Sequence, residues 1–320
     1  MSLIESVRER CRDVAGRARF VHIERDRIAA YARSLPLDQA VCPEHDPHTH
    51  CLGRGDMTAA FFVTLDAINF GSGYFPHLRK RPGLSGYYTV AASLNDLFRA
   101  QGPLTPEQLV RLTAQDCAGI FGQDLSDPAI LELMALFAQA LRDLGCLLLD
   151  RYHGRFMDLI EAAGQSAEEM VRLLTAMPYF RDVEPYDGLE VPFYKRAQLT
   201  AADLALAFGG EGPGRFTDLD RLTIFADNLV PHVLRVDRLL TYDADLASRI
   251  DLEQLIPAGS PEEVEIRACA VHTVELLVQE LRAAGQPVTS QQLDYILWNR
   301  GHDPYYKKIL PRHRTRTVYY

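Results

Sequence analysis

Helix-start signals recur along this chain and constrain its fold more than any other feature of the sequence. A capping box places a serine or threonine three residues before a glutamate or glutamine. Four such pairs stand out, which are Thr105 with Gln108, Ser166 with Glu169, Ser260 with Glu263 and Thr289 with Gln292. Two of them add a proline at the first helical position. The sequence therefore predicts a mainly α-helical protein with few or short strands.

Helical periodicity is clearest in two long segments. One helix is predicted from Asp127-Pro128 through about Tyr152, and a second follows Ser260 and stops at Gly285-Gln286-Pro287. In the first, the apolar residues at helical spacing are Ile130, Leu133, Met134, Phe137, Leu141 and Leu144. The best strand candidate is residues 186–194, where Gly188 and Pro192 break the alternation.

The length of 320 residues allows one large domain or two average ones. A glycine- and proline-rich stretch at residues 209–214 is a possible subdivision, but patterns on both sides of it are helical. We therefore expect a single compact helical domain over residues 1–320. No apolar run approaches the ~20 residues of a membrane helix, and residues 1–19 are a charged amphipathic helix rather than a signal peptide. A cytoplasmic location is expected.

The charge balance bears on the class of partner. The chain carries 34 basic and 43 acidic side chains, a net charge of −9. Proteins that coat nucleic acid or anionic membranes depend on a positive field, which this chain lacks as a whole. A local group of basic residues could still bind one phosphate. The motifs Gly-x-x-x-x-Gly-Lys-Ser/Thr, Gly-x-Gly-x-x-Gly and Gly-x-Ser-x-Gly are absent, so the usual anchors of nucleoside triphosphates, dinucleotides and serine hydrolases are missing.

A short segment between Cys42 and Cys51 also holds His45, His48 and His50. These are zinc-ligand types, but their spacing is too cramped for a familiar zinc finger and no second Cys/His pair follows. We therefore predict no metal site, and an irregular loop that contributes one histidine to a binding pocket. The six cysteines include no Cys-x-x-Cys pair, which favours reduced thiols.

Two segments place polar side chains among apolar ones. Asp66 and Asn69 lie within the aromatic run of residues 61–76, so Asn69 either ends a helix or reads the edge of a planar ligand stacked on Phe70. Asp227 follows a helix expected over residues 219–225 and precedes Pro231, which would stop that helix. A carboxylate at a helix C-terminus opposes the helix dipole, so Asp227 is either paired with an arginine or held for chemistry.

Further candidates are a buried glutamate and two basic groups. Glu265 shares a helix face with Cys269 and His272, either as a structural partner of Arg267 or as a catalytic group. Two groups of basic residues could hold a phosphate, at 195–196 and at the arginines 312, 314 and 316. An arginine can donate two parallel hydrogen bonds to a phosphate, and a lysine offers a compact positive charge. The apolar Val318-Tyr319-Tyr320 ending indicates a packed C-terminus.

Taken together, these segments resemble the queuosine salvage protein family, the queuosine 5′-phosphate N-glycosylases. The matching blocks follow one another over nearly the whole chain, at residues 64–74, 193–198, 222–231, 256–269, 297–298 and 313–320. The resemblance implies an all-α fold similar to helix-hairpin-helix DNA glycosylases. It also implies release of queuine, a 7-deazaguanine base, from queuosine 5′-monophosphate without a cofactor. The family is expected to have Tyr-Arg where this chain has Asn228-Leu229.

The resemblance also suggests roles for individual residues. Cleavage of an N-ribosidic bond passes through an oxocarbenium-like sugar, which a desolvated carboxylate stabilises. Asp227 matches the family's aspartate and is predicted to do this, with Glu265 as a second catalytic candidate. The predicted base contacts are Asp66, Asn69, Phe70, Asn228 and His50, and the predicted phosphate contacts are Lys195, Arg196 and Arg316.

Two other classes of function remain open from the sequence. One is a glycosylase of the same fold that acts on nucleic acid, which the net charge disfavours. The other is a non-catalytic nucleotide-binding module whose structure is stabilised by a metal bound to the histidines and cysteines of residues 42–51. We expect a monomer with a small-molecule substrate and neither polymeric nucleic acid nor membrane as partner.

Overall fold

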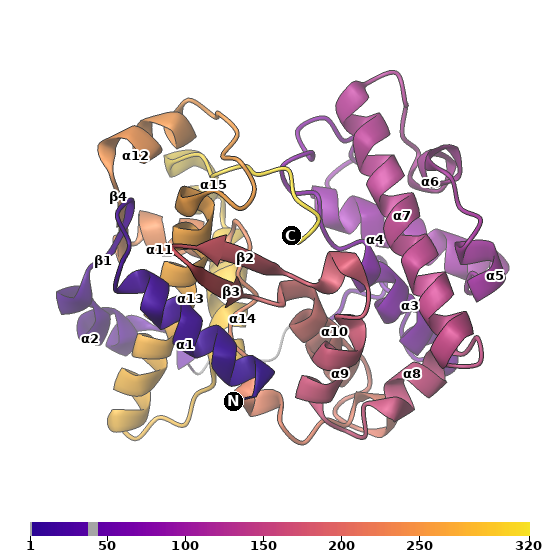
Figure 1. Ribbon diagram of the computed structural model, residues 1–320, viewed down its shortest axis with the longest axis horizontal. Helices are drawn as coiled ribbons and strands as arrows, with labels where there is room; N and C mark the ends of the chain where they lie inside the picture. Colours follow the sequence, from indigo (N-terminus) through magenta and orange to yellow (C-terminus); the bar gives the residue numbers. More distant parts are fainter. Residues whose placement is uncertain (1, 38–43) are drawn as a thin grey trace. The chain divides into compact units, whose positions relative to one another are not determined.

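The computed structural model describes residues 2–37 and 44–320. The described part is mainly helical, and its strands form two antiparallel pairs, β1 with β4 and β2 with β3 (Figure 1). The chain divides into two compact units. Of the described residues, unit 1 comprises 2–37, 182–195 and 218–316, and unit 2 comprises 44–181, 196–217 and 317–320. The glycine-rich stretch 209–214 therefore lies inside unit 2, and the single domain over residues 1–320 stays a prediction.

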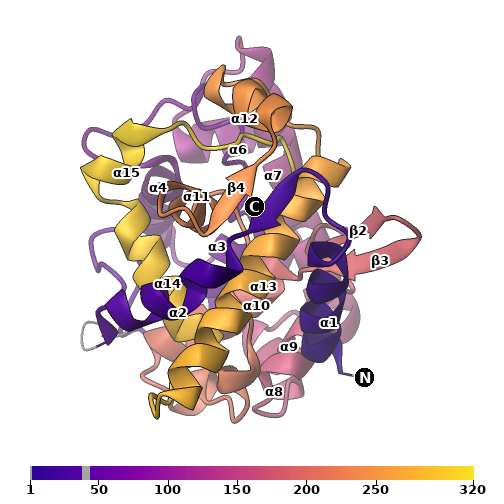
Figure 2. The same ribbon diagram turned by 90° about the vertical axis from the view of Figure 1, so that its left-hand side faces the viewer.

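Unit 1 is assembled around one long buried helix, α13 (Pro261–Ala283). Helices α1 and α2 both pack beside it (Figure 2), and the strand pair β1–β4 joins residues 21–23 to residues 240–242. Besides α13, its elements are α1 (Leu3–Ala15), β1 (Val21–Ile23), α2 (Arg25–Ser34), β2 (Val183–Tyr186), β3 (Leu189–Pro192), the 3₁₀ turn η4 (Leu219–Arg221), α11 (Val230–Val236), β4 (Leu240–Tyr242), α12 (Ala244–Asp251), α14 (Ser290–Gly301) and α15 (Pro304–Ile309).

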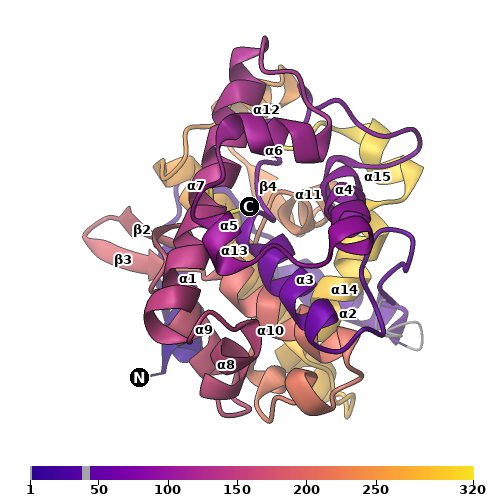
Figure 3. The same cartoon turned by 90° about the vertical axis from the view of Figure 1, so that its right-hand side faces the viewer.

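Unit 2 is a helical assembly in which α7 (Pro128–Arg151) packs against α3, α5 and α6 (Figure 3). Gly145 allows the close approach of α5, because a Cβ there would lie 2.8 Å from the carbonyl oxygen of Pro106. The other elements are α3 (Asp56–Ala67), α4 (Gly86–Gln101), α5 (Pro106–Leu109), α6 (Ala114–Phe121), α8 (Phe156–Ala162), α9 (Ala167–Leu174), η2 (Pro178–Phe180), α10 (Lys195–Ala207, whose first residue belongs to unit 1) and η3 (Gly212–Gly214).

The capping signals mark real helix starts. Complete capping boxes close at Thr105 and Thr289, and the hydroxyls of Ser166 and Ser260 accept the N3 amides of α9 and α13. The two long helices predicted by periodicity are confirmed as α7 and α13 within two residues at each end. Local hydrogen bonding at a cap depends on few neighbours, so sequence alone locates it.

The predicted strand at residues 186–194 is instead the second half of a β-hairpin. Strands β2 and β3 pair with Val183 opposite Pro192 and Tyr186 opposite Leu189. Asp187 and Gly188 form the turn with φ of 44° and 78°, the paired positive values that a tight hairpin turn needs. Gly188 therefore interrupts the predicted strand, as expected, because it lies in the turn between β2 and β3.

The C-terminal residues pack within unit 2, as the apolar ending indicates. Tyr320 is 2% exposed, and its carbonyl oxygen accepts a hydrogen bond from the Gly71 amide at 2.9 Å. In the described ranges, no helix has the length and apolar character needed to span a membrane.

Candidate active site

Asp227 lies before the start of a helix, not at the end of one. Residues 222–229 are not helical, and α11 begins at Val230 with Pro231 in its first turn. The carboxylate Oδ1 accepts the amides of Leu229 at 2.7 Å and Val230 at 3.3 Å. The predicted helix C-terminus at Asp227 is therefore wrong, because proline suits the first turn of a helix as well as the residues after one. The dipole of α11 favours a negative charge here.

A second carboxylate, Asp294 on α14, acts electrostatically with Asp227. Asp294 is 3% exposed, and its Oδ1 accepts the Phe225 amide at 2.9 Å. Burial, and secondly the negative charge of Asp227, raise the pKa of Asp294 to about 7, while the Phe225 amide and Lys195 act in the opposite direction. Near neutral pH the buried Asp294 carboxyl group therefore readily holds a proton.

Sequence reasoning missed Asp294. It lies in the segment Ser290–Gly301, where Leu293, Ile296 and Leu297 mark the buried side of the helix. A carboxyl group beside those positions is the signal that could have found it, because buried carboxyl groups are costly and cluster at functional sites.

Two cations act on these carboxylates. Lys195 is 6% exposed, and its charge contributes to the field at Asp294. Burial lowers the pKa of the Arg312 guanidinium, and the negative charge of Asp227 opposes that shift. Arg316 is half-buried further along the same C-terminal segment. Electrostatic interactions therefore link four side chains of unit 1, those of Asp227, Asp294, Lys195 and Arg312.

Asn228 ties the Asp227 segment to the C-terminal segment. Its side chain is 9% exposed, and its amide donates to the carbonyl oxygen of His313 at 3.4 Å. The C-terminal segment is held again at the next residue, where the Ile256 amide donates to the carbonyl oxygen of Arg314 at 2.8 Å. Asn228 therefore helps to place its neighbour Asp227, and its contact with the base stays a prediction.

Glu265 has a structural task that occupies both of its oxygens. It is fully buried, and Oε2 accepts the amides of Arg19, Phe20 and Val21 at 2.9, 2.7 and 3.0 Å. Oε1 accepts the Tyr186 hydroxyl at 2.7 Å. These bonds fasten the start of β1 and the end of β2 to α13. The structure thus gives Glu265 a structural role, and its catalytic role stays a prediction. Its expected partner Arg267 binds Asp182 instead, at 2.6 Å.

Four other predicted residues contact one another in unit 2. Helix α3 ends at Ala67, and the Asn69 amide donates to Asp66 Oδ1 at 3.3 Å. Arg196 donates to the carbonyl oxygens of Asp66 and Ala67 at 2.8 and 2.7 Å, and also to that of Tyr179. The helix-end interpretation of Asn69 is thus favoured over ligand binding.

Phe70 belongs to the same group of residues and is also held by contacts within unit 2. The Phe70 ring is 2% exposed and meets Phe137 edge-on, at a centroid distance of 5.1 Å. The Arg196 guanidinium lies 4.9 Å from the centroid of Phe70 and 4.5 Å from that of Phe180. Arg196 is only 1% exposed and caps the end of α3, which is a structural role, and its contact with the phosphate stays a prediction.

His50 is buried in unit 2, with its two ring nitrogens in polar contacts. Nε2 lies 3.0 Å from the Tyr87 hydroxyl and Nδ1 lies 3.0 Å from the Thr49 hydroxyl. Burial lowers the pKa of His50, which keeps the ring neutral. Its contact with the base stays a prediction.

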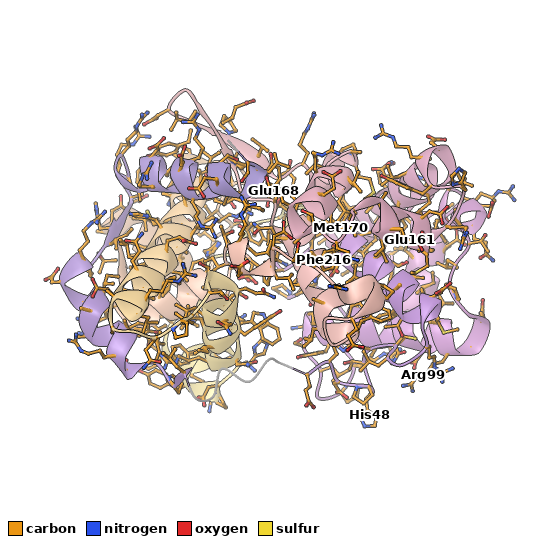
Figure 4. The ribbon with its side chains drawn as sticks, turned by 90° about the horizontal axis from the view of Figure 1, so that it is seen from below. His48, Arg99, Glu161, Glu168, Met170 and Phe216 are labelled. Atoms are coloured by element: carbon orange, nitrogen blue, oxygen red, sulfur yellow. The ribbon has the colours of Figure 1, made fainter. Side chains whose placement is uncertain are left out.

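The neighbouring histidine, His48, lies beside Arg99 of α4 in Figure 4. The Arg99 guanidinium donates to the carbonyl oxygen of Pro47 at 2.6 Å, which fastens this loop to α4. Cys42 lies outside the described residues. Among residues 2–37 and 44–320, no three His, Cys, Asp or Glu side chains are grouped so that they could hold a metal.

Comparison with known proteins matches this chain to one family and to named relatives. A sequence model described as "Queuosine salvage protein" matches residues 49–320. A protein of Sphaerobacter thermophilus is 39% identical over 315 residues, covering 97% of this chain and 96% of its own. One of Mus musculus is 30% identical and covers 98% of both chains, and one of Dictyostelium discoideum is 33% identical over 83% and 79%. All three are named queuosine 5′-phosphate N-glycosylase/hydrolase.

Proposed function

The chain belongs to the queuosine salvage protein family, and we propose that it hydrolyses the N-glycosidic bond of queuosine 5′-monophosphate and releases queuine. The names of the relatives support this substrate and reaction. The observation in the structure that carries the proposal is the unequal carboxylate pair, Asp227 beside two backbone amides and Asp294 with its pKa raised to about 7. Pairs of carboxyl groups with different protonation states are typical of glycosidic hydrolysis.

Asp227 is the group that stabilises the transition state in this proposal. Departure of the base leaves positive charge on the sugar, and a negative carboxylate nearby lowers the energy of that state. The Leu229 and Val230 amides hold Oδ1 in place before the reaction begins, so little reorganisation is needed. The second oxygen of Asp227 is the one we assign to the sugar or to the attacking water.

Asp294 is assigned to the departing base. A 7-deazapurine lacks N7, so the protonation that usually helps a purine to leave is not possible. Stabilisation must therefore come from hydrogen bonds to other atoms of the base. In its protonated form Asp294 donates one, while its Oδ1 remains fixed by the Phe225 amide.

The 5′-phosphate is assigned to Lys195. Its buried position makes its charge more effective than one in bulk water, and its influence on Asp294 associates it with the reacting groups. Holding a remote phosphate supplies binding energy that positions the glycosidic bond. Arg316 stays a predicted second phosphate contact.

We further propose that the substrate is the free nucleotide and that the protein acts as a cytoplasmic monomer. The net charge of −9 favours a small substrate over polymeric nucleic acid. The likeness to helix-hairpin-helix DNA glycosylases is also a proposal, supported by the mainly helical architecture and by the family resemblance.

The test is direct. Purified protein incubated with queuosine 5′-monophosphate should yield free queuine, detected by liquid chromatography with mass spectrometry. Asp227→Asn should keep its circular dichroism spectrum and bind the nucleotide, measured by calorimetry, while base release falls at least about 1,000-fold. Wild-type protein that binds the nucleotide without cleaving it would favour the non-catalytic module. Near-wild-type turnover of Asp227→Asn would remove Asp227 from its role.

A further inference from the structure

A fully buried ion pair lies in unit 1 next to the two segments that carry Asp227 and Lys195. Arg267 of α13 is 0% exposed and is among the largest fully buried side chains among the described residues. Its guanidinium donates to both oxygens of Asp182, with Nη1 to Oδ1 at 2.9 Å and Nη2 to Oδ2 at 2.6 Å. This is the planar, two-bond geometry that fixes orientation as well as distance.

Each member of the pair also holds one of the two segments. Arg267 Nε donates to the carbonyl oxygen of Ala226 at 3.0 Å, one residue before Asp227. Asp182 Oδ2 accepts the backbone amide of Lys195 at 3.1 Å. Two segments that are more than 30 residues apart in the chain are therefore fastened to one rigid unit.

The residues before Lys195 depend on the same pair. The carbonyl oxygen of Asp182 accepts the Phe193 amide at 2.9 Å, and the Arg267 guanidinium lies 3.9 Å from the centroid of the Phe193 ring. Tyr194 has a φ of 50°, a left-handed conformation that costs energy in a residue with a side chain. The surrounding contacts impose this conformation, which determines the direction in which the chain enters α10.

Stability alone is a weak reason for such a pair. Burying two charges costs desolvation energy that their attraction often fails to exceed, and well-packed apolar residues can be as stable. Positioning is a stronger reason, because a displacement of about 1 Å in a reacting group can cost roughly 100-fold in rate.

We propose that the Arg267–Asp182 pair is a positioning device that sets the Asp227 segment and the Lys195 segment relative to each other for the glycosidic reaction. The inference rests on the proposed function, since it takes Asp227 and Lys195 as the groups that act on the substrate. Neither Arg267 nor Asp182 contacts substrate in this proposal. Both act through the backbone that they hold.

The decisive variant removes both charges together, as Arg267→Met with Asp182→Leu, so that neither member of the pair is left buried without the other. It also removes the cation that lies 3.8 Å from the buried carboxylate of Glu263. It should unfold cooperatively, and its kcat for queuosine 5′-monophosphate should be about 100-fold below that of the wild type. Its preference for the monophosphate over the unphosphorylated nucleoside, as a ratio of kcat/KM, should fall to that of Lys195→Ala. Adding Lys195→Ala to the double variant should lower this ratio no further, because both changes remove the same contact.

A matched control separates positioning from loss of folded protein. The pair Arg249–Glu262 also joins α13 to another helix, at 2.7 Å. Arg249→Met with Glu262→Leu should keep the wild-type kcat and phosphate preference. A purely structural loss would lower the rates on both substrates equally and leave the ratio unchanged.

The inference is overturned by a folded Arg267→Met, Asp182→Leu variant with the wild-type kcat and phosphate preference. If that variant does not fold, Asp182→Asn serves in its place, since it keeps the volume and removes one acceptor. Its phosphate preference should fall, and an unchanged ratio would overturn the inference. A wild-type protein that releases no queuine overturns the proposed function, and this inference with it, whereas active wild type with unaffected variants overturns the inference alone.

Discussion

Two aspartates of the candidate site differ in what surrounds their oxygens. Asp227 Oδ1 accepts two amides at the start of α11, whereas Asp294 accepts one amide and is buried on α14 beside the charge of Asp227. Amide donors favour the ionised form of a carboxyl group, and burial favours the neutral form. In the proposed reaction, one aspartate would stabilise the positive charge of the sugar and the other would donate a hydrogen bond to the base.

The pH dependence of base release follows from Asp294. Its pKa of about 7 means that the donor form is lost as the pH rises through 7, so kcat/KM should fall about tenfold per unit above that value. Asp294→Asn keeps a donor at every pH and should abolish this decline between pH 7 and 9. Rates measured over pH 5–9 with both proteins check the prediction. A decline that persists in Asp294→Asn would assign it to another group.

The same shift affects stability. The folded state holds the Asp294 proton up to about pH 7, whereas an unfolded aspartate loses it near pH 4, so the folded state binds more protons in that window. The contribution of this group to stability is fully present below about pH 4 and is lost as the pH rises to 7. Asp294→Asn should show a smaller decline of Tm over the same range.

Lys195 is the residue that we propose binds the 5′-phosphate. Lys195→Ala should lower kcat/KM for queuosine 5′-monophosphate by about 100-fold, the value of a charged hydrogen bond of roughly 3 kcal/mol. The unphosphorylated nucleoside lacks the group that Lys195 holds and should be affected far less. Initial rates on both substrates provide the measurement. Equal losses on the two would mean that Lys195 does not bind the phosphate.

For single residues, the sequence indicates which side chains have useful chemistry, but not which groups surround them in the folded protein. Asp227 could be singled out because an aspartate among apolar residues before a proline is unusual, but the proline was placed at the wrong end of a helix. Arg196 and Glu265 were chosen for their charge. Their partners are backbone groups distant in the chain, which no local pattern reveals.

At the scale of elements, Glu265 links α13 to the start of β1 and the end of β2. Glu265→Gln replaces an acceptor of four hydrogen bonds by a group that must present two donors, so we expect a loss of about 3 kcal/mol in the free energy of unfolding. Urea denaturation measures this loss. Turnover per folded molecule should remain within about twofold of the wild type, whereas a catalytic glutamate would cost roughly 100-fold or more.

Elements were predictable where their signals are local. Helices α7 and α13 follow from a cap, a proline and an apolar periodicity, all contained within the segment. The β2–β3 hairpin was incompletely predicted, because an Asp-Gly pair indicates a turn only when the strands on both sides of it are recognised. Strand β2 contains Pro185, which weakens its pattern.

At the scale of the whole molecule, charge distribution limits the class of substrate. The acidic excess repels a polyanion over most of its length, while one or two buried cations suffice for a single phosphate. In the described part of unit 1, Lys195 is a buried cation and Arg312 is a half-buried one. In the proposed function, a monophosphate would gain their attraction without bringing further phosphates against the acidic protein.

This charge argument predicts that free nucleotide is cleaved and that queuosine within an RNA strand is not. A queuosine-containing oligoribonucleotide should release no queuine under conditions in which the monophosphate is fully converted. Lowering the salt from 200 to 20 mM should not induce binding of the oligonucleotide, measured by fluorescence anisotropy, because few counterions would be released. The monophosphate provides the positive control in the same buffer. Salt-dependent binding, or base release from the strand, would instead favour a glycosylase that acts on nucleic acid.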